Sequence, residues 1–339
     1  MVIGHAGCPE AMYQFIYSFH MPLFFIASGY FFSAKSIDDK KHFLLKKIKG
    51  IYIPYVICSL LFLVAHNFFF SIGVLNDVYG TRSGIVDHLY TTREIISRAA
   101  HIVTLTGGWD AFLLGAYWFM RTLFISSLFL CFGAWALNKR LKSADKSIYA
   151  LAVTCLIIAG VMKLTDFKVP YYGGYNEMMG VFFMAVGYAM RRFIAQLNES
   201  GIAIIVATVG VIVLFLIHPA SLEPNSTFAD TCLVPFSGAF GTYVVYRISR
   251  KWGQCGHCSG IAYIGQKSFW ILTFHHLAFK VSEFAEIAYY DLPPEMIGCH
   301  SSIPPQDNWF FLIHTVTAVS LCTLLAFLFS KTKGIFVRA

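Results

Sequence analysis

Nine stretches of the chain are long and apolar enough to cross a lipid bilayer, and this pattern restricts the possible folds more than any other feature. A spanning helix needs ~20 predominantly apolar residues. Lipid offers no hydrogen-bond partners to the backbone, so such segments fold as helices. The stretches run near Ala11–Ala34, Ile51–Val74, Ala111–Leu137, Ser147–Leu164, Gly174–Ile194, Gly201–Ile217, Ala229–Ser249, Gly260–Val281 and Trp309–Ser330. We expect an all-α, polytopic transmembrane bundle of about nine full spans, preceded at Met1–Ala6 by the outer end of an incomplete helix.

The composition agrees with a membrane protein. Hydrophobic residues make up 57% of the chain and charged residues 13%, with a mean hydropathy of +0.62. Soluble domains carry about 25% charged residues. The formal net charge of +8 fits basic cytoplasmic loops, and no soluble segment combines bases with aromatics. We therefore expect one membrane domain over residues 1–339, the lipid bilayer as a partner, and no nucleic acid. The oligomeric state stays open.

Charge alternates from loop to loop. Basic residues follow the first, third, fifth, seventh and ninth spans, whereas the loops 217–229 and 282–308 contain no Lys or Arg. By the positive-inside rule the basic loops and the C-terminus are cytoplasmic. The outer loop 76–110 is long, and Thr92–Leu105 within it has helical spacing. This segment is either an interfacial helix or lid over an outer cavity, or an ordinary solvated loop helix.

Polar side chains inside the spans are the candidate functional residues. A charged group at the bilayer centre costs at least ~2.5–3.5 kcal/mol, so such residues are functional candidates by default. With the orientation above, they fall at one level in the outer half of the bilayer, which predicts an outward-open polar cavity. Each alone also has a structural interpretation, as an interhelical hydrogen-bond partner, an interfacial tryptophan or a snorkelling side chain. The set comprises His5, His20, Tyr117, Trp118, Arg121, Glu177, His275 and His276. Ser28 follows His20 at i+8, and Ser28-Gly29 predicts a small, polar spot where another helix or a ligand can approach closely.

Two further motifs lie near the cytoplasmic side. Lys46 and Lys49 precede Pro54 at the entry of the second full span. They are either ordinary positive-inside charge or a docking site for a phosphorylated cytosolic donor such as a coenzyme. Cys255 and Cys258 form a C-x-x-C pair with His257 between them. A zinc site needs about four ligands and no second pair exists, so no metal site is expected.

Three segments together resemble acyltransferase family 3, a family of integral membrane O-acyltransferases, and within it the fucose 4-O-acetylase-like sugar acetyltransferase branch. The first is Gly4-His5 followed by the stretch Ser18–Phe32, SFHMPLFFIASGYFF. The second is Tyr117–Phe124, YWFMRTLF, and the third is Tyr263–His276, YIGQKSFWILTFHH. The basic run Lys46–Lys49 occupies the place of the family's acyl-CoA-linked basic run. The resemblance spans most of the chain in the same motif order.

The resemblance implies about ten helices of ~20 residues each, with acetyl-CoA as a co-substrate from the cytoplasm rather than a permanently bound cofactor. The acceptor would be a hydroxyl of a sugar or cell-surface polysaccharide at the outer face of a bacterial inner membrane. His5 would be the essential histidine, supported by His20 as a second catalytic residue. Ser28, Tyr117, Trp118, Arg121, Glu177 and His276 would bind substrate, and Lys46 and Lys49 would hold coenzyme phosphates.

The chain departs from the family pattern at its start. Family members have further residues before this histidine, so we expect the first helix to be incomplete. Either the start of the sequence is misassigned, the gene is truncated, or the protein is inactive. Two other functions remain open. One is a proton-coupled transporter with His20, Glu177 and Arg121 as a relay. The other is a catalytically inactive truncated homologue. The identity of the acyl group, acetyl or another, also stays open. So does the route of transfer, which is either direct or through an acyl-histidine intermediate.

Overall fold

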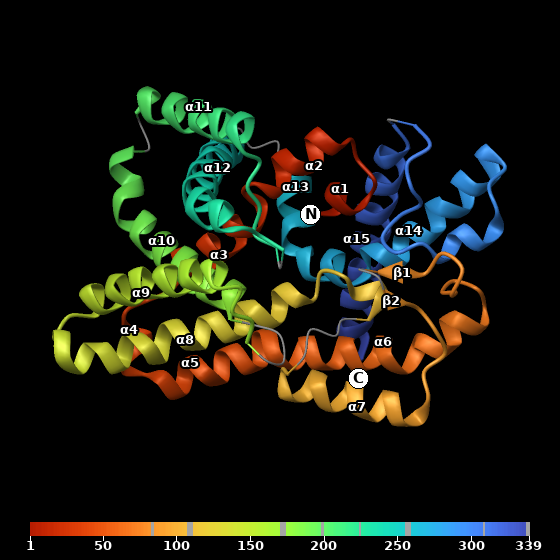
Figure 1. Cartoon of the computed structure of the whole chain (residues 1–339), viewed down its shortest axis with the longest axis horizontal. Coiled ribbons are helices and arrows are strands. Elements are labelled where there is room, and N and C mark those ends of the chain that lie inside the picture. The colour runs from red at the N-terminus through yellow and green to blue at the C-terminus, as the bar shows by residue number, and fades with distance from the viewer. Residues whose placement is uncertain are drawn as a thin grey trace. The chain divides into compact units, whose positions relative to one another are not determined.

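The computed structural model describes residues 1–82, 85–106, 111–169, 174–197, 200–223, 225–254, 259–307 and 309–336. The prediction of an all-α fold is confirmed (Figure 1). The α-helices are α1 Val2–His5, α2 Glu10–Tyr17, α3 His20–Tyr30, α4 Lys35–Asp38, α5 Lys40–Lys47, α6 Ile53–Ser71, α7 Thr92–Thr104, α8 Trp118–Leu141, α9 Ala144–Leu164, α10 Tyr175–Leu197, α11 Gly201–Ile217, α12 Phe228–Gln254, α13 Ser259–Gln266, α14 Ser268–Tyr290 and α15 Phe310–Phe336.

Short elements complete the described chain. A π-helical turn, η1 Ile48–Tyr52, joins α5 to α6, and 3₁₀ turns form η2 Phe112–Leu114 and η3 Pro294–Gly298. The strands β1 Thr81–Arg82 and β2 Ile85–Val86 pair antiparallel. The candidate metal pair Cys255 and Cys258, with His257, lies outside the described residues.

Four helical segments are long and apolar enough to cross a membrane within the described part of the chain. They are 40–71 (α5, η1 and α6), α8, α9 and residues 310–330 of α15. Helices α10, α12 and α14 are also at least 23 residues long but carry more polar side chains, and α11 is a shorter apolar helix of 17 residues. A multispanning membrane protein follows, whereas the number of nine spans stays a prediction.

The prediction of one continuous helix over Ala11–Ala34 is wrong. Helix α2 ends at Tyr17 and α3 begins at His20, with Phe19 at φ −143° and ψ −15° between them. The cause is Pro22. Inside a helix its ring would clash with the carbonyl of Ser18, four residues earlier, and it has no N–H to donate there, but a proline is tolerated in a first helical turn. The chain therefore starts a new helix two residues before Pro22.

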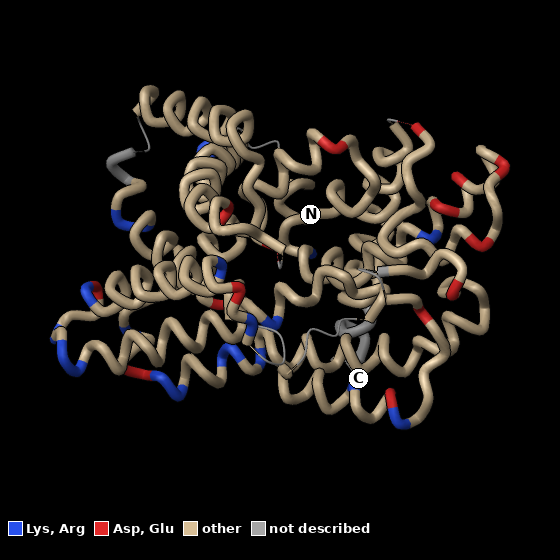
Figure 2. Tube along the Cα trace, viewed as in Figure 1, with Lys and Arg blue, Asp and Glu red and all other residues tan. Residues whose placement is uncertain are grey.

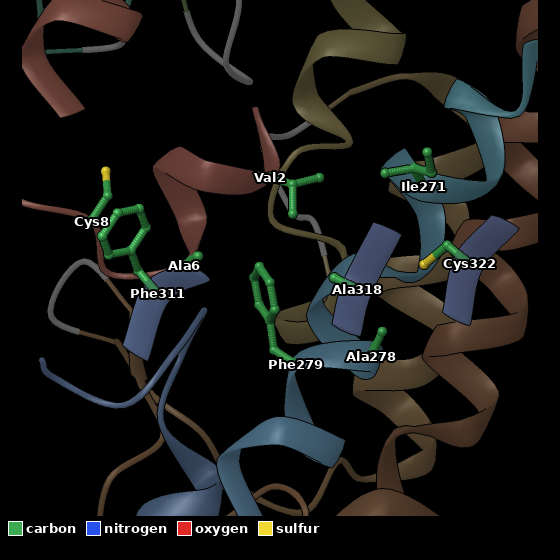
Figure 3. Packing of buried hydrophobic residues seen from close by; sticks show 9 residues of the cluster. All are labelled: Val2, Ala6, Cys8, Ile271, Ala278, Phe279, Phe311, Ala318 and Cys322. Atoms are coloured by element: carbon green, nitrogen blue, oxygen red, sulfur yellow. The ribbon is translucent and has the colours of Figure 1, made fainter. Parts of the chain in front are cut away.

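The described chain forms two compact units. Unit 1 comprises residues 1–13, 55–118 and 256–339, and unit 2 comprises residues 14–54 and 119–255. In unit 1, α14 packs along α15, and α1 contacts both helices. Figure 3 shows the apolar cluster at this junction, in which the Phe279 ring of α14 lies near Ala6, directly after α1, and Ala318 of α15. Burial of Phe279 and its neighbours holds the first residues of the chain against α14.

In unit 2, α3 packs between α10 and α12, and α10 also packs on α9. The α3–α10 crossing is close because glycines face backbone on both sides. A Cβ on Gly29 would lie 1.9 Å from the Met184 carbonyl oxygen, and one on Gly187 would lie 1.9 Å from that of Ile26. Small residues allow such approach between membrane helices. At Ser28-Gly29, a small and polar spot, the group that approaches closely is therefore helix α10.

Charge is distributed differently in the two units. In unit 2, Lys and Arg gather along α4 and α5 and at the α8–α9 connection, as Figure 2 shows. In unit 1, acidic residues follow one another from the end of α14 into η3: Glu283, Glu286, Asp291 and Glu295 (Figure 2). The predicted loop helix is also present, as α7, and it begins with a capping box between Thr91 and Glu94. Reciprocal capping of this kind satisfies two backbone donors at a helix start.

Candidate functional site

The short helix α1 carries His5 to the surface of α14. Val2 and Ala6, on either side of His5 in the sequence, are buried in the apolar cluster with Phe279. On α14, His275 and His276 precede Phe279 by four and three residues, so they lie on the same side of that helix. Packing of α1 against Phe279 therefore brings His5 next to the two histidines. A cluster of three histidines results from segments more than 260 residues apart in the sequence.

The three rings form a tight group. The ring centroids of His5 and His276 are 5.0 Å apart, those of His5 and His275 are 5.4 Å apart, and those of His275 and His276 are 4.2 Å apart. One nitrogen from each ring lies within 4.8 Å of the others. His275 and His276 are buried, whereas His5 is half-buried. His5 is therefore the most exposed member of the cluster.

Hydrogen bonding fixes the tautomer of His275. Its Nδ1 lies 2.9 Å from the Ile271 carbonyl oxygen and 3.0 Å from that of Leu272. Carbonyl oxygens only accept, so Nδ1 carries the proton and donates. In the neutral imidazole Nε2 then holds the lone pair. His275 thus presents an acceptor nitrogen, buried in the protein, beside the other two rings.

The wall of the cluster is made by η2 and the loop after η3. The His300 ring stacks on His276 with centroids 5.6 Å apart and is itself in edge contact with Phe112 of η2. Gly115 lies against both histidines, since a Cβ there would be 3.1 Å from His276 Nε2 and 3.2 Å from His300 Cε1. His300 was not predicted because it lies in the acidic loop 282–308, where spacing gives no indication of its partner.

Tyr117 belongs to the same unit and is fully buried. Its hydroxyl is 2.7 Å from the Thr273 hydroxyl of α14, and Thr273 Oγ1 also donates to the Phe269 carbonyl oxygen. Because that proton is used, the Tyr117 hydroxyl donates to Thr273. The bond ties the start of α8 to the helix that carries His275 and His276. Trp118, next to Tyr117, is half-buried.

A second buried polar network continues along α14. Lys280 Nζ lies 2.9 Å from Glu283 Oε2 and donates to the Cys299 carbonyl oxygen at 2.7 Å. His314 of α15 lies 2.9 Å from Glu286 through Nε2 and 2.7 Å from the Ser282 hydroxyl through Nδ1.

Burial raises the pKa of the Cys299 thiol to about 11. That thiol therefore stays protonated and is a poor nucleophile at neutral pH.

Arg121 and Glu177 form a buried pair in unit 2. Arg121 Nη2 and Glu177 Oε1 are 3.9 Å apart. The carboxylate also accepts from the Thr122 hydroxyl at 3.1 Å and from the Gly174 backbone N–H at 2.6 Å. These contacts hold Glu177 at the start of α10 against the start of α8. Two predicted substrate-binding residues are therefore neighbours, and an Arg–carboxylate pair can bind polar groups such as hydroxyls or a carbonyl oxygen.

His20 lies at the start of α3, directly after the break. Its Nδ1 is 3.1 Å from the Ile16 carbonyl oxygen, which the break removes from the regular helical pattern, and its ring makes an edge contact with Tyr17. This geometry gives His20 a clear capping role.

Ser28, one residue before Gly29, is half-buried on the same helix. Both residues belong to unit 2, whereas His5 and His276 belong to unit 1, and the convergence of all predicted site residues on one cavity stays a prediction.

Lys46 and Lys49 are exposed on the basic segment of unit 2. Lys46 lies near the end of α5, and Lys49 lies inside the π-helical turn η1. The turn widens the helix by one residue and thereby shifts the directions of the side chains that follow. An exposed pair of ammonium groups at a helical irregularity can contact a phosphate group.

These observations define a class of protein. It is a helical membrane protein in which a half-buried histidine lies beside two buried histidines. The model of one protein family, described as an acyltransferase domain, matches residues 2–331. The chain belongs to this family, acyltransferase family 3, and the predicted family is confirmed. The protein is accordingly a membrane acyltransferase. No curated protein and no solved structure matches it significantly.

Proposed function

We propose that the protein transfers an acetyl group from acetyl-CoA to a hydroxyl of a sugar or cell-surface polysaccharide. The observation that carries the proposal is the half-buried His5 ring against two buried histidines. A histidine with a normal pKa near 6.5 suits a general base at neutral pH. His5 removes the proton of the acceptor hydroxyl as its oxygen attacks the thioester carbonyl. His276 contacts the His5 ring and positions it.

We assign to the remaining predicted residues the roles that the sequence leads us to expect. Arg121, paired with Glu177, orients the acceptor or stabilises the negative charge that develops on the thioester oxygen. Trp118 and Tyr117 border the start of α8, and Tyr117 fixes that segment to Thr273. Lys46 and Lys49 hold the phosphates of the coenzyme. Ser28 binds the acceptor, and His20 supports catalysis besides capping the break before α3.

The location follows from the same proposal. With basic loops and C-terminus in the cytoplasm, acetyl-CoA enters from the cytoplasmic side and the acceptor is modified at the outer face of a bacterial inner membrane. The coenzyme is consumed as a co-substrate, and no resident cofactor takes part.

The test is acyl transfer by the purified protein in proteoliposomes. Radiolabelled acetyl-CoA is supplied with a panel of sugar and polysaccharide acceptors, and labelled acceptor is counted. We expect His5→Ala to abolish the label, because base catalysis contributes typically 10²–10⁴-fold, and His101→Ala, on α7 away from the cluster, to leave it unchanged. Labelling that survives His5→Ala at the wild-type rate contradicts the assigned base. If no acyl group moves from any acyl-CoA, the whole proposal fails.

One observation favours the transporter alternative. The chain is broken between α2 and α3 next to His20, and transporters place substrate sites at discontinuous helices. Proton uptake into the same proteoliposomes, followed with a pH-sensitive dye, separates the two functions. Substrate-dependent proton movement without acyl-CoA supports a transporter, whereas acyl transfer without proton movement supports the enzyme.

A further inference from the structure

We propose that His5, His275 and His276 form a binding site for a divalent transition-metal ion, with Zn²⁺ as the ion that fits best. Zinc is commonly held by three histidines with a fourth position left open to water or a substrate. The three rings supply one nitrogen each, all within 4.8 Å of one another. Imidazole is a ligand suited to zinc, copper, nickel and iron, and no carboxylate or thiolate is needed.

The strongest support comes from His275. Metal-bound histidines usually donate their second ring N–H to a backbone carbonyl or a carboxylate, which fixes the tautomer and orients the ring. His275 Nδ1 does this twice, to Ile271 and Leu272. Among the described residues, its fully buried Nε2 has no hydrogen-bond partner. A buried acceptor without a partner costs about 1–3 kcal/mol, and a metal ion at the cluster removes that cost.

The geometry requires only a small closure. Three nitrogens each 2.0–2.1 Å from a tetrahedral zinc are roughly 3.3 Å apart, closer than the 4.8 Å limit of the cluster. His275 and His276 are neighbours on a long helix and are fully buried, whereas His5 is half-buried on the four-residue helix α1. The movement therefore falls to His5, whose exposed side also leaves the fourth position open.

Metal binding has a consequence for the proposed chemistry. The lone pair with which His5 removes a proton is the same lone pair that ligates a metal ion. Bound zinc and base catalysis by His5 therefore exclude each other, and zinc inhibits acyl transfer. This inhibition rests on the proposed function, whereas the binding itself does not.

The experiment measures binding directly. The full chain is purified in detergent without a polyhistidine tag, stripped with a chelator and titrated with Zn²⁺ by calorimetry. We expect one ion per chain. His275→Gln and His276→Gln should each weaken binding by at least roughly 100-fold, since even an outer-shell partner is worth about 10–100-fold. His101→Gln, elsewhere in unit 1, is the matched control and should bind like the wild type.

Two further measurements keep the result interpretable if a variant folds poorly. Co²⁺ in place of Zn²⁺ gives visible absorption bands typical of a tetrahedral site in the wild type and loses them in the double variant His275→Gln/His276→Gln. Zn²⁺ also raises the Tm of the wild type, because an ion that binds only the folded state stabilises it, and leaves the Tm of that variant unchanged. A wild type that binds no more zinc than the double variant overturns the proposal.

The acyl-transfer assay separates this inference from the proposed function. Tight zinc binding with zinc-inhibited transfer supports both. Tight binding with no transfer under any condition supports the metal site and contradicts the enzyme. Transfer that increases with zinc keeps the metal site and contradicts His5 as the base. Transfer unaffected by zinc, with no stoichiometric binding, removes the metal site and leaves the enzyme.

Discussion

The Ser237 hydroxyl of α12 donates a 2.8 Å hydrogen bond to the Ser18 carbonyl oxygen, at the break between α2 and α3. Pro22 has no N–H for that carbonyl, so another helix supplies the donor. Helix α12 also packs closely against the start of α3. A Cβ on Gly238 would lie 2.5 Å from Pro22 Cβ, and a Cβ on Gly241 would lie 2.4 Å from Phe19 Cγ. The break is therefore built jointly by α3 and α12.

Replacement of Ser237 by alanine should destabilise the protein at this break. The variant leaves a buried carbonyl without its partner, and hydrogen bonds between membrane helices average ~0.6 kcal/mol with a maximum near 1.7. We expect a loss of about 1 kcal/mol in the free energy of unfolding, measured by denaturant titration in detergent. Thr154→Val is the control, because among the described residues the Thr154 hydroxyl bonds within α9, to the Ala150 carbonyl oxygen. Equal losses in both variants contradict a special role for Ser237.

The crossing of α3 and α10 should not accept a methyl group. Gly29→Ala places a carbon 1.9 Å from the Met184 carbonyl oxygen, so the two helices must separate. Overpacking costs typically 1–3 kcal/mol and occasionally more, and we expect at least about 3 kcal/mol here because the obstacle is backbone. The Tm in detergent reports the loss. Gly50→Ala, with open space around its Cβ, is the matched control and should stay within about 1 kcal/mol of the wild type.

The histidine cluster shows what the sequence could predict. Charge alternation and depth placed His5 and His276 at one level, and the structure brings them together. The break at Ser18 was not predicted although Pro22 was visible, because a proline in an apolar stretch is compatible with both a kink and a restart. His300 and the His314–Glu286 pair were also missed. Their contacts depend on the register between distant segments, and residue spacing along one helix does not determine it.

The buried pair Arg121–Glu177 should show strong energetic coupling. Glu177→Gln leaves the guanidinium without its carboxylate, and breaking a buried pair in this way costs about 3–5 kcal/mol. The double variant Arg121→Gln/Glu177→Gln removes the remaining buried charge and should be less destabilised than the sum of the single variants by about 1–3 kcal/mol. A double-mutant cycle on unfolding free energies in detergent measures this term. Additive effects would show that the two side chains act independently.

The start of α7 should respond to pH through Glu94. Hydrogen bonds from His88 and Thr91 lower the pKa of this carboxyl from its ordinary 4.5 to about 2, and the same contact raises the pKa of His88 above 6.5. Stability from a lowered carboxyl pKa is present above pH 4.5 and is lost as the pH falls toward 2. Stability from a raised histidine pKa is present below pH 6.5 and is lost at higher pH.

The difference between the wild type and Glu94→Gln should therefore be largest between about pH 4.5 and 6.5. Hydrogen exchange of the α7 amides measures it. The comparison also separates Glu94 from Asp87, because Asp87, whose pKa burial raises to about 6 in the wild type, is present in both proteins. Glu295→Gln, at an exposed position in η3, should leave α7 unchanged. A difference that is constant from pH 3 to 8 would contradict the His88–Glu94 contact.

Gly115 lies against the rings of His276 and His300, which stack on each other. A methyl group there would be 3.1 Å from His276 Nε2 and 3.2 Å from His300 Cε1, so each ring must shift by a few tenths of an ångström. A misplacement of 1 Å can cost about 10²-fold in rate, and we expect Gly115→Ala to lower kcat for acyl transfer by roughly 3–10-fold. KM for the coenzyme should not change, because Lys46 and Lys49 lie on another part of the chain.

Gly260→Ala is the control, since its Cβ would meet nothing within 4 Å. Both variants should unfold within about 1 kcal/mol of the wild type, because a contact near 3.1 Å with a side chain can relax whereas one with backbone cannot. A fall in kcat with an unchanged Tm then assigns the effect to the position of His276. If Tm falls together with kcat, the loss of activity would instead mean that Gly115 serves packing alone. Unchanged kcat in Gly115→Ala would place the reacting groups away from His276.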